Sequence, residues 1–175
     1  MFILGIDVGI INLALVQIEI DDATWEIKRV CACHRADMTR GCQSRETADR
    51  VVAMVAKYQV VFDTSDVVLI ERQPLTGITA VEELLFYMFR QKCKKISPNS
   101  MHKYFGIGHL DYEGRKEQTV SRARPWLKEQ EGWIRNADRQ HDMADAMCII
   151  LWWREQNRPQ GPNIWEKFRC LTPAT

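Results

Sequence analysis

Four acidic residues occupy positions where a protein core would normally have apolar side chains. Asp7 ends the apolar run FILGID, and Glu71 ends the run VVLIE. Asp142 and Asp145 lie three residues apart in HDMADAMCII, which places them on one face of a helix. Adjacent carboxylates at the edge of a core repel each other and are costly to desolvate. The simpler interpretation is that these are solvated strand ends and an acidic first helical turn.

The apolar pattern predicts the elements that would position these acids. Strands are expected at 2–9, 12–20, 24–34, 66–74 and 94–98, with a hairpin at DDAT. Helices are expected at 44–62, 78–91, 116–130 and 138–156, and a glycine-containing loop at 105–116. This order predicts an α/β ribonuclease H-like fold, a mixed five-stranded sheet with helices on both faces. Periodicity alone also fits other α/β arrangements.

In such a sheet the first and fourth strands are central neighbours, and the last helix can cross their ends. Asp7, Glu71, Asp142 and Asp145 would then converge, and their repulsion would need a counter-charge. Oxygen-only ligands favour Mg²⁺ or Mn²⁺. Two such ions could activate a water and stabilise the leaving oxygen of a phosphodiester. The four acids, in this order on these elements, therefore predict a metal-dependent site.

The composition is typical of a soluble domain of 175 residues with a full core, and we expect one domain spanning 1–175. No apolar run is long enough for a membrane span, and the start MFILGIDVG is not typical of a signal or transit peptide. The six cysteines fall in or beside apolar stretches, which favours a reducing compartment. Zinc binding by Cys31, Cys33 and His34 is an alternative, but no second ligand pair follows.

The net charge of +1 conceals a basic region. Residues 90–139 hold twelve Lys and Arg against six Asp and Glu, whereas residues 1–89 hold eight against thirteen. Such an asymmetry could arise by chance, and it is also what a phosphate-binding surface around an acidic metal site would show. The residues expected to contact phosphates are Lys92, Lys94, Lys95, Lys103, Arg115, Lys116, Arg122 and Arg124. Trp126 and Trp133 could stack on bases, although their spacing favours core packing.

Two further residue groups have open interpretations. His141 could relay a proton, but a histidine at this position more often caps the helix or bonds to backbone. The helix at 78–91 is apolar nearly all round, which predicts burial on two sides and a dimer interface, with Leu85 at its centre. Trp165 and Phe168 in the tail are expected to pack against the domain.

The sequence resembles the RuvC-like Holliday junction resolvases, most closely their poxvirus-type branch. The resemblance is carried by GIDVGIINLALV (5–16), VVLIERQP (67–74), KKISPNSMHKYF (94–105) and HDMADAMCII (141–150), which together span most of the chain. It implies a Mg²⁺-dependent homodimeric endonuclease that nicks four-way DNA junctions symmetrically and leaves 5′ phosphates. The four acids match the catalytic acids of the family. The poxvirus-type enzymes process branched and concatemeric replication intermediates in cytoplasmic viral factories.

The resemblance also implies a lysine near the scissile phosphate, for which Lys116 is the best match and Lys103 the second. The sequence departs from bacterial members just after Glu71. There they carry an aromatic that wedges into the junction, and this chain has Arg72-Gln73-Pro74-Leu75.

Three other functions fit parts of the pattern. A related nuclease acting on RNA–DNA hybrids or flaps would use the same four acids. A phosphotransferase of the actin and sugar-kinase type also has a first strand running into a DxG turn, but here no second glycine-rich loop follows. A junction-binding protein without catalysis would not need all four acids.

Overall fold

The structure, a computed structural model, describes residues 1–159. Its centre is a five-stranded sheet with the strand order β3-β2-β1-β4-β5. The strands are β1 (Phe2–Asp7), β2 (Leu13–Ile20), β3 (Ile27–Ala36), β4 (Val67–Glu71) and β5 (Cys93–Ile96). Because β1 to β3 pair antiparallel and β1, β4 and β5 pair parallel, the sheet is mixed. The predicted mixed sheet, with the first and fourth strands as neighbours, is confirmed.

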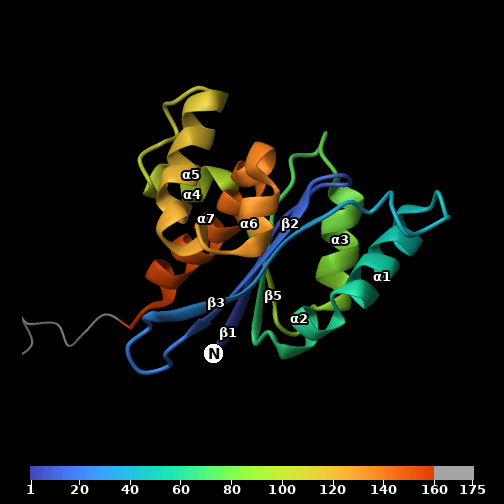
Figure 1. Ribbon diagram of the computed structural model, residues 1–175, viewed down its shortest axis with the longest axis horizontal. Helices are drawn as coiled ribbons and strands as arrows, with labels where there is room; N and C mark the ends of the chain where they lie inside the picture. The colour runs from blue at the N-terminus through green and yellow to red at the C-terminus, as the bar shows by residue number, and fades with distance from the viewer. Residues whose placement is uncertain (160–175) are drawn as a thin grey trace, which may run out of the picture.

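Helices cover both faces of the sheet, as predicted (Figure 1). One face carries α1 (Thr47–Lys57), α2 (Gln59–Thr64) and α3 (Thr79–Met88). The other side carries α4 (Pro98–Tyr104), α5 (Tyr112–Leu127), α6 (Glu131–Arg135), a 3-10 turn (Ala137–Arg139) and α7 (Gln140–Asn157). No helix among residues 1–159 is long and apolar enough to cross a membrane.

The alternation of side chains along β1 and β4 builds two separate cores. Leu4 and Ile6 pack with the α1–α3 side, together with Val68 and Ile70 of β4. Ile3 and Leu69 lie in the core on the α7 side. Since successive strand residues point to opposite faces, Asp7 and Glu71 also belong to the α7 side. The same pattern that fills the cores therefore aims both strand acids at one helix.

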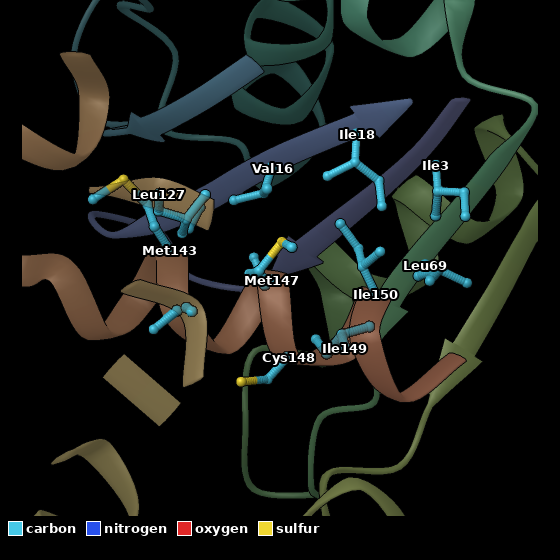
Figure 2. Close-up of a cluster of buried hydrophobic side chains, with 14 of the residues drawn as sticks. Ile3, Val16, Ile18, Leu69, Leu127, Met143, Met147, Cys148, Ile149 and Ile150 are labelled. Carbon is cyan, nitrogen blue, oxygen red and sulfur yellow. The ribbon is translucent and has the colours of Figure 1, made fainter. Parts of the chain in front are cut away.

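Helix α7 is the central element of that second core. Nine of its residues are buried, among them Met143, Met147 and Ile150. Figure 2 shows these side chains beneath Ile3 and Ile18 of the sheet. A helix that is apolar on several sides must be covered on several sides, and α5 and α4 cover α7 away from the sheet. The two acids of α7 are thus attached to the most buried helix of the domain.

Gly5 permits the close approach of α7 to β1. A Cβ atom built on Gly5 would lie 2.3 Å from the backbone oxygen of Ala146 and 2.8 Å from Cγ1 of Ile150. A side chain at this position would therefore force the helix backbone away from the strand. Asp7 lies two residues further along β1, on the same side.

We expect Gly5→Ala to be destabilising and to impair the site. Overpacking of this kind costs about 1–3 kcal/mol, and a displacement of catalytic groups by about 1 Å can reduce turnover on the order of 100-fold. Thermal melting and cleavage rate test the two effects separately. Gly108→Ala is the stability control, because the nearest atom to its Cβ would be 3.9 Å away. Equal melting temperatures for Gly5→Ala and the unmodified chain would contradict the close-packing argument.

The predicted helices differ from those observed at several ends. The helix expected at 44–62 is divided at Tyr58 into α1 and α2, just before the β-branched pair Val60-Val61. Pro98 begins α4, which was not predicted. Helix α5 begins at Tyr112 instead of 116, because the Asp111 side chain accepts a hydrogen bond from the Gly114 N–H at 2.8 Å. Lys116 therefore lies in the second turn of α5. Helix α6 was also not predicted.

Within one subunit the 78–91 helix is buried on one side, so the expected contact of its other side with a second subunit stays a prediction, but Leu85 is not at that interface. Val81 and Leu85 of α3 are fully buried against α1 and the sheet, so Leu85 belongs to the core. Tyr87 and Met88 are 78% and 41% exposed. A Leu85→Arg change would disrupt the fold and would not test assembly. Any interface on this helix must use its Tyr87 face.

The predictions for the tryptophans, the cysteines and the C-terminal tail have different outcomes. Trp133 is buried in the core, as its spacing favoured, whereas Trp126 is partly exposed. Cys31 is exposed and Cys33 is buried with a pKa raised to about 12 by burial. Their side chains therefore do not join in a zinc site. Trp165 and Phe168 lie outside the described residues, so their packing and the single domain over 1–175 stay predictions.

Candidate active site

The carboxyl ends of β1 and β4 bring two acids together. The parallel register pairs Ile6 with Ile70, so the next residues of the two strands, Asp7 and Glu71, stand side by side. Their carboxyl groups are close enough for the charge of Glu71 to act on Asp7. Both are partly buried.

Helix α7 adds two further acids at the same place. Asp145 is partly buried, its charge acts on Asp7, and it lines a small cavity together with Thr119 of α5. Asp142, one turn earlier, is 5% exposed. The convergence of the four predicted acids from β1, β4 and α7 follows directly from the strand alternation and the seating of α7.

The electrostatics show that this cluster is unfavourable without a counter-charge. Burial, followed by the charges of Glu71 and Asp145, raises the pKa of Asp7 well above its ordinary value. Burial also raises the pKa of Glu71. The pKa of Asp145 rises to about 7, through burial and then repulsion by Glu71 and Asp142. Protons therefore hold part of the cluster neutral when no cation is bound.

Asp142 is held by its own helix turn. The Arg139 guanidinium donates to both carboxylate oxygens, at 2.9 and 3.1 Å. Nε2 of His141 lies 3.1 Å from Asp142 Oδ1, but off the hydrogen-bond direction, and it has no hydrogen-bond partner. Burial lowers the pKa of His141 despite the neighbouring aspartate. In the described part of the chain, His141 therefore does not cap α7, and its Nε2 has no hydrogen-bonded group to which it could pass a proton.

A small cavity of about 160 Å³ opens beside Glu71 and Asp145. Lys116 and Thr119 of α5 line it from the opposite side. The Lys116 ammonium lies 3.9 Å from the centre of the Tyr112 ring, a cation–π contact that holds the lysine along α5. The structure thus places Lys116 beside two of the acids. Lys103, the second lysine candidate, lies in an adjoining groove.

The donor set suits a hard divalent cation. All four side chains offer carboxylate oxygens, the ligands that Mg²⁺ and Mn²⁺ prefer. Within residues 1–159, no three His, Cys, Asp or Glu side chains already form a metal-binding group. Asp142 is instead paired with Arg139, and burial and mutual repulsion raise the pKa values of Asp7 and Asp145. Binding of a cation would relieve the repulsion.

The larger groove next to this cavity has a volume of about 860 Å³. We call it the α4 groove; its cationic lining residues are Arg72, Lys103 and Arg115. His102 and Arg115 line both hollows, so the α4 groove is continuous with the acid cluster. None of the described residues lining the groove is acidic.

The other predicted basic residues do not join this groove. Lys92 lies at the amino end of β4, where its ammonium donates to the carbonyls of Phe62 and Ser65 at 2.8 Å each. Lys95 pairs with Glu82 and Glu83. Lys94 lies over the Trp153 ring, and Arg122 donates a hydrogen bond to the Phe105 carbonyl. Arg124 is exposed on α5. A role in DNA binding stays a prediction for Lys94, Arg122 and Arg124, whereas the partners of Lys92 and Lys95 within the protein make their ammonium groups less available to a phosphate.

A protein-family model and several solved structures match this chain. The family model described as "Poxvirus A22 protein" matches residues 1–156. The chain belongs to the poxvirus A22 protein family. A search of curated proteins gave no significant match for this A22 family chain.

Solved structures similar to this A22 family protein share its fold. The fowlpox virus resolvase in complex with its Holliday junction substrate is 19% identical, with a TM-score of 0.65, over 89% of this chain and 98% of that one. The fowlpox virus Holliday junction resolvase alone gives 18% identity and a TM-score of 0.65, covering 89% and 99%. Thermus thermophilus RuvC gives 18% identity and a TM-score of 0.58, covering 89% and 97%. The predicted ribonuclease H-like fold is confirmed.

Several residues at the site of this A22 family protein were not identified from the sequence. Arg139 lies three residues before Asp142, a spacing that could have indicated the ion pair. Thr119 and Tyr112 gave no signal, because their contacts depend on how α5 packs on α7. Gln73 donates a hydrogen bond to Glu71 at 3.1 Å, and the sequence shows only that it is near.

Proposed function

We propose that the protein is a Holliday junction resolvase, a metal-dependent endonuclease that nicks four-way DNA junctions. The convergence of four acids from β1, β4 and α7 in a member of the A22 family carries this proposal. The solved fowlpox virus resolvase with its Holliday junction supports it, as a protein of the same fold over nearly its whole length. The poxvirus family supports action on replication and recombination intermediates in the cytoplasm of an infected cell.

The acids would hold Mg²⁺, with Mn²⁺ as a substitute and two ions per site. Asp7 would be one ligand, and Glu71, Asp145 and Asp142 would complete the ligand set. Such ions supply the charge that lowers the pKa of the attacking water and stabilises the leaving oxygen. The protein's own contribution would be to bring the four carboxylates together and to hold Lys116 beside Glu71 and Asp145. The burial of α7 keeps the acids rigid.

We further propose that one junction arm lies in the α4 groove. Its three cations would contact phosphates and position the DNA without reading its sequence. The opening of the groove toward Glu71 and Asp145 would lead the strand to the acids. Lys116 lies at this transition, which supports a role close to the scissile phosphate.

A matched pair of lysine substitutions tests the DNA path. Lys103→Ala should weaken junction binding and reduce the slope of log affinity against log salt by about 1. Lys92→Ala should leave affinity unchanged and lower stability, because two backbone carbonyls lose their donor, at about 1–3 kcal/mol for a buried acceptor. Binding titrations at several salt concentrations, without divalent metal, measure both. Equal loss of affinity in the two variants would contradict the groove assignment.

The protein should act as a homodimer, since the two equivalent strands of a junction require two sites. The exposed face of α3 supports an interface there, because Tyr87 and Met88 are large apolar side chains that one subunit leaves exposed. Tyr87→Arg should raise the dimer dissociation constant by about 30-fold or more, as for a central interface residue. Sedimentation velocity measures this. Ile134→Arg, at an exposed residue on the other side of the sheet, is the control; dissociation by both variants or neither would refute the interface.

The proposed reaction is tested with a mobile four-way junction in Mg²⁺, beside matched duplex, flap and RNA–DNA hybrid substrates. Paired symmetric nicks on the junction alone are expected. Cleavage of the hybrid or flap but not the junction would keep the metal site and reject the resolvase. Absence of cleavage on every substrate in both Mg²⁺ and Mn²⁺ would reject the enzyme.

A further inference from the structure

A chain of hydrogen bonds leads from the acid cluster into the protein behind it. The Gln73 side-chain amide donates to Oε2 of Glu71 at 3.1 Å. Residues two apart in extended chain point to the same side, so Gln73 faces the carboxylate that precedes it. This bond fixes one oxygen of Glu71.

The backbone of Gln73 is fixed in turn by a buried acid on α3. Its N–H donates to Oε2 of Glu82 at 2.8 Å. Glu82 is 3% exposed, and its other oxygen lies 3.1 Å from the ammonium of Lys95. A buried carboxylate is strongly unfavourable unless its charge and its acceptors are satisfied. Here one oxygen is matched by a cation and the other by a backbone donor.

Resting on the proposed function, we propose that Gln73 and Glu82 are positioning residues, which hold Glu71 in the orientation that binds the divalent cation. Glu82 fixes the turn after β4, and Gln73 transmits that position to the Glu71 carboxylate. The Arg72 N–H, bonded to the Ile96 carbonyl at 2.7 Å, anchors the same turn on β5. Loss of an interaction that orients a metal ligand typically reduces metal affinity or activity by about 10–100-fold.

Gln73→Ala tests this directly, since it removes the donor without changing charge. Metal affinity is measured from the rise in melting temperature on titration with Mg²⁺ and Mn²⁺, in the absence of DNA. The variant should need about 10–100-fold more metal than the unmodified chain. Gln73 also lines the α4 groove, but the groove's phosphate contacts are assigned to its three cationic residues, so the junction affinity of the variant in EDTA should be unchanged. Glu83→Ala is the matched control, because Glu83 is an exposed partner of the same Lys95 and does not contact Gln73.

Glu82 requires two variants, because Glu82→Ala leaves Lys95 poorly paired and can unfold the protein. Glu82→Gln keeps an oxygen that can accept from the Gln73 N–H, so its metal affinity should stay within a few fold of that of the unmodified chain. If Glu82→Ala folds, its metal affinity should fall as in Gln73→Ala.

Three results would overturn the inference. Unchanged metal affinity in Gln73→Ala would exclude positioning. A loss of junction affinity in EDTA with normal metal affinity would make Gln73 a DNA contact instead. Absence of any metal effect on the unmodified protein would reject the proposed metal site itself, and this inference with it.

Discussion

Asp145→Asn should abolish junction cleavage while leaving junction binding intact. The substitution keeps the shape of the side chain, but it removes one of the four charges that would hold the cation. Loss of one directly placed electrostatic group in a catalytic site reduces turnover on the order of 100–1,000-fold. The measurement is single-turnover cleavage of a four-way junction in Mg²⁺, with binding measured in EDTA.

Asp63→Asn is the matched control for this loss of charge. Asp63 is exposed on α2, at the amino end of β4 and away from the cluster. It should cleave at the normal rate. An Asp145→Asn variant that retained more than about a tenth of the cleavage rate would contradict the assignment of Asp145. Even residues that only orient a metal ligand typically change metal affinity or activity by about 10-fold or more when they are replaced.

The same substitution should stabilise the protein when metal is absent. The pKa of Asp145 rises from 3.8 to about 7 on folding, so the folded state binds the proton more tightly than the unfolded state. Its contribution to stability is therefore full at low pH and is lost as the pH rises from about 4 to about 7. Above that window the aspartate is a net destabilising group, and asparagine is not.

Thermal melting in EDTA at pH 5 and pH 8 measures this effect. A smaller difference is expected at pH 5, inside that window, than at pH 8, where Asp145→Asn should be more stable by up to about 4 kcal/mol, since the pKa rises from 3.8 to about 7 and each pKa unit corresponds to about 1.4 kcal/mol. In a domain of this size each kcal/mol corresponds to roughly 2–4 °C in melting temperature. Saturating Mg²⁺ should reverse the order, because only the aspartate gains from the cation. A lower melting temperature for the variant at pH 8 in EDTA would show that the acids do not repel each other in the folded protein.

The fold and the four acids could be predicted because both depend on local patterns. Alternating apolar residues place Asp7 and Glu71 on strands, and the strand order makes those strands neighbours. The supporting contacts could not be predicted in the same way. Glu82 meets Gln73 only because α3 returns to the turn after β4, and Thr119 meets Asp145 only because α5 packs on α7. These contacts depend on tertiary packing, which a single sequence does not show.

The basic residues show the limit of charge counting. Lys92, Lys103 and Lys95 are equivalent in composition, yet the first caps backbone carbonyls, the second lines the α4 groove and the third neutralises a buried acid. Exposure and partners decide which of them is available to a phosphate. The α3 helix gave a similar error, since an apolar residue such as Leu85 is as typical of a core as of an interface.

Gly5 provides a criterion for judging whether another sequence with the same four acids can form the same site. An aspartate that ends the first strand can be recognised in any sequence, but recognition does not show that the last helix lies close enough to complete the site. The residue two places before it carries that information, because a glycine there allows backbone to rest on backbone. A sequence with all four acids and a bulky residue at this position would therefore belong to a protein with the ligands of the site but without its geometry.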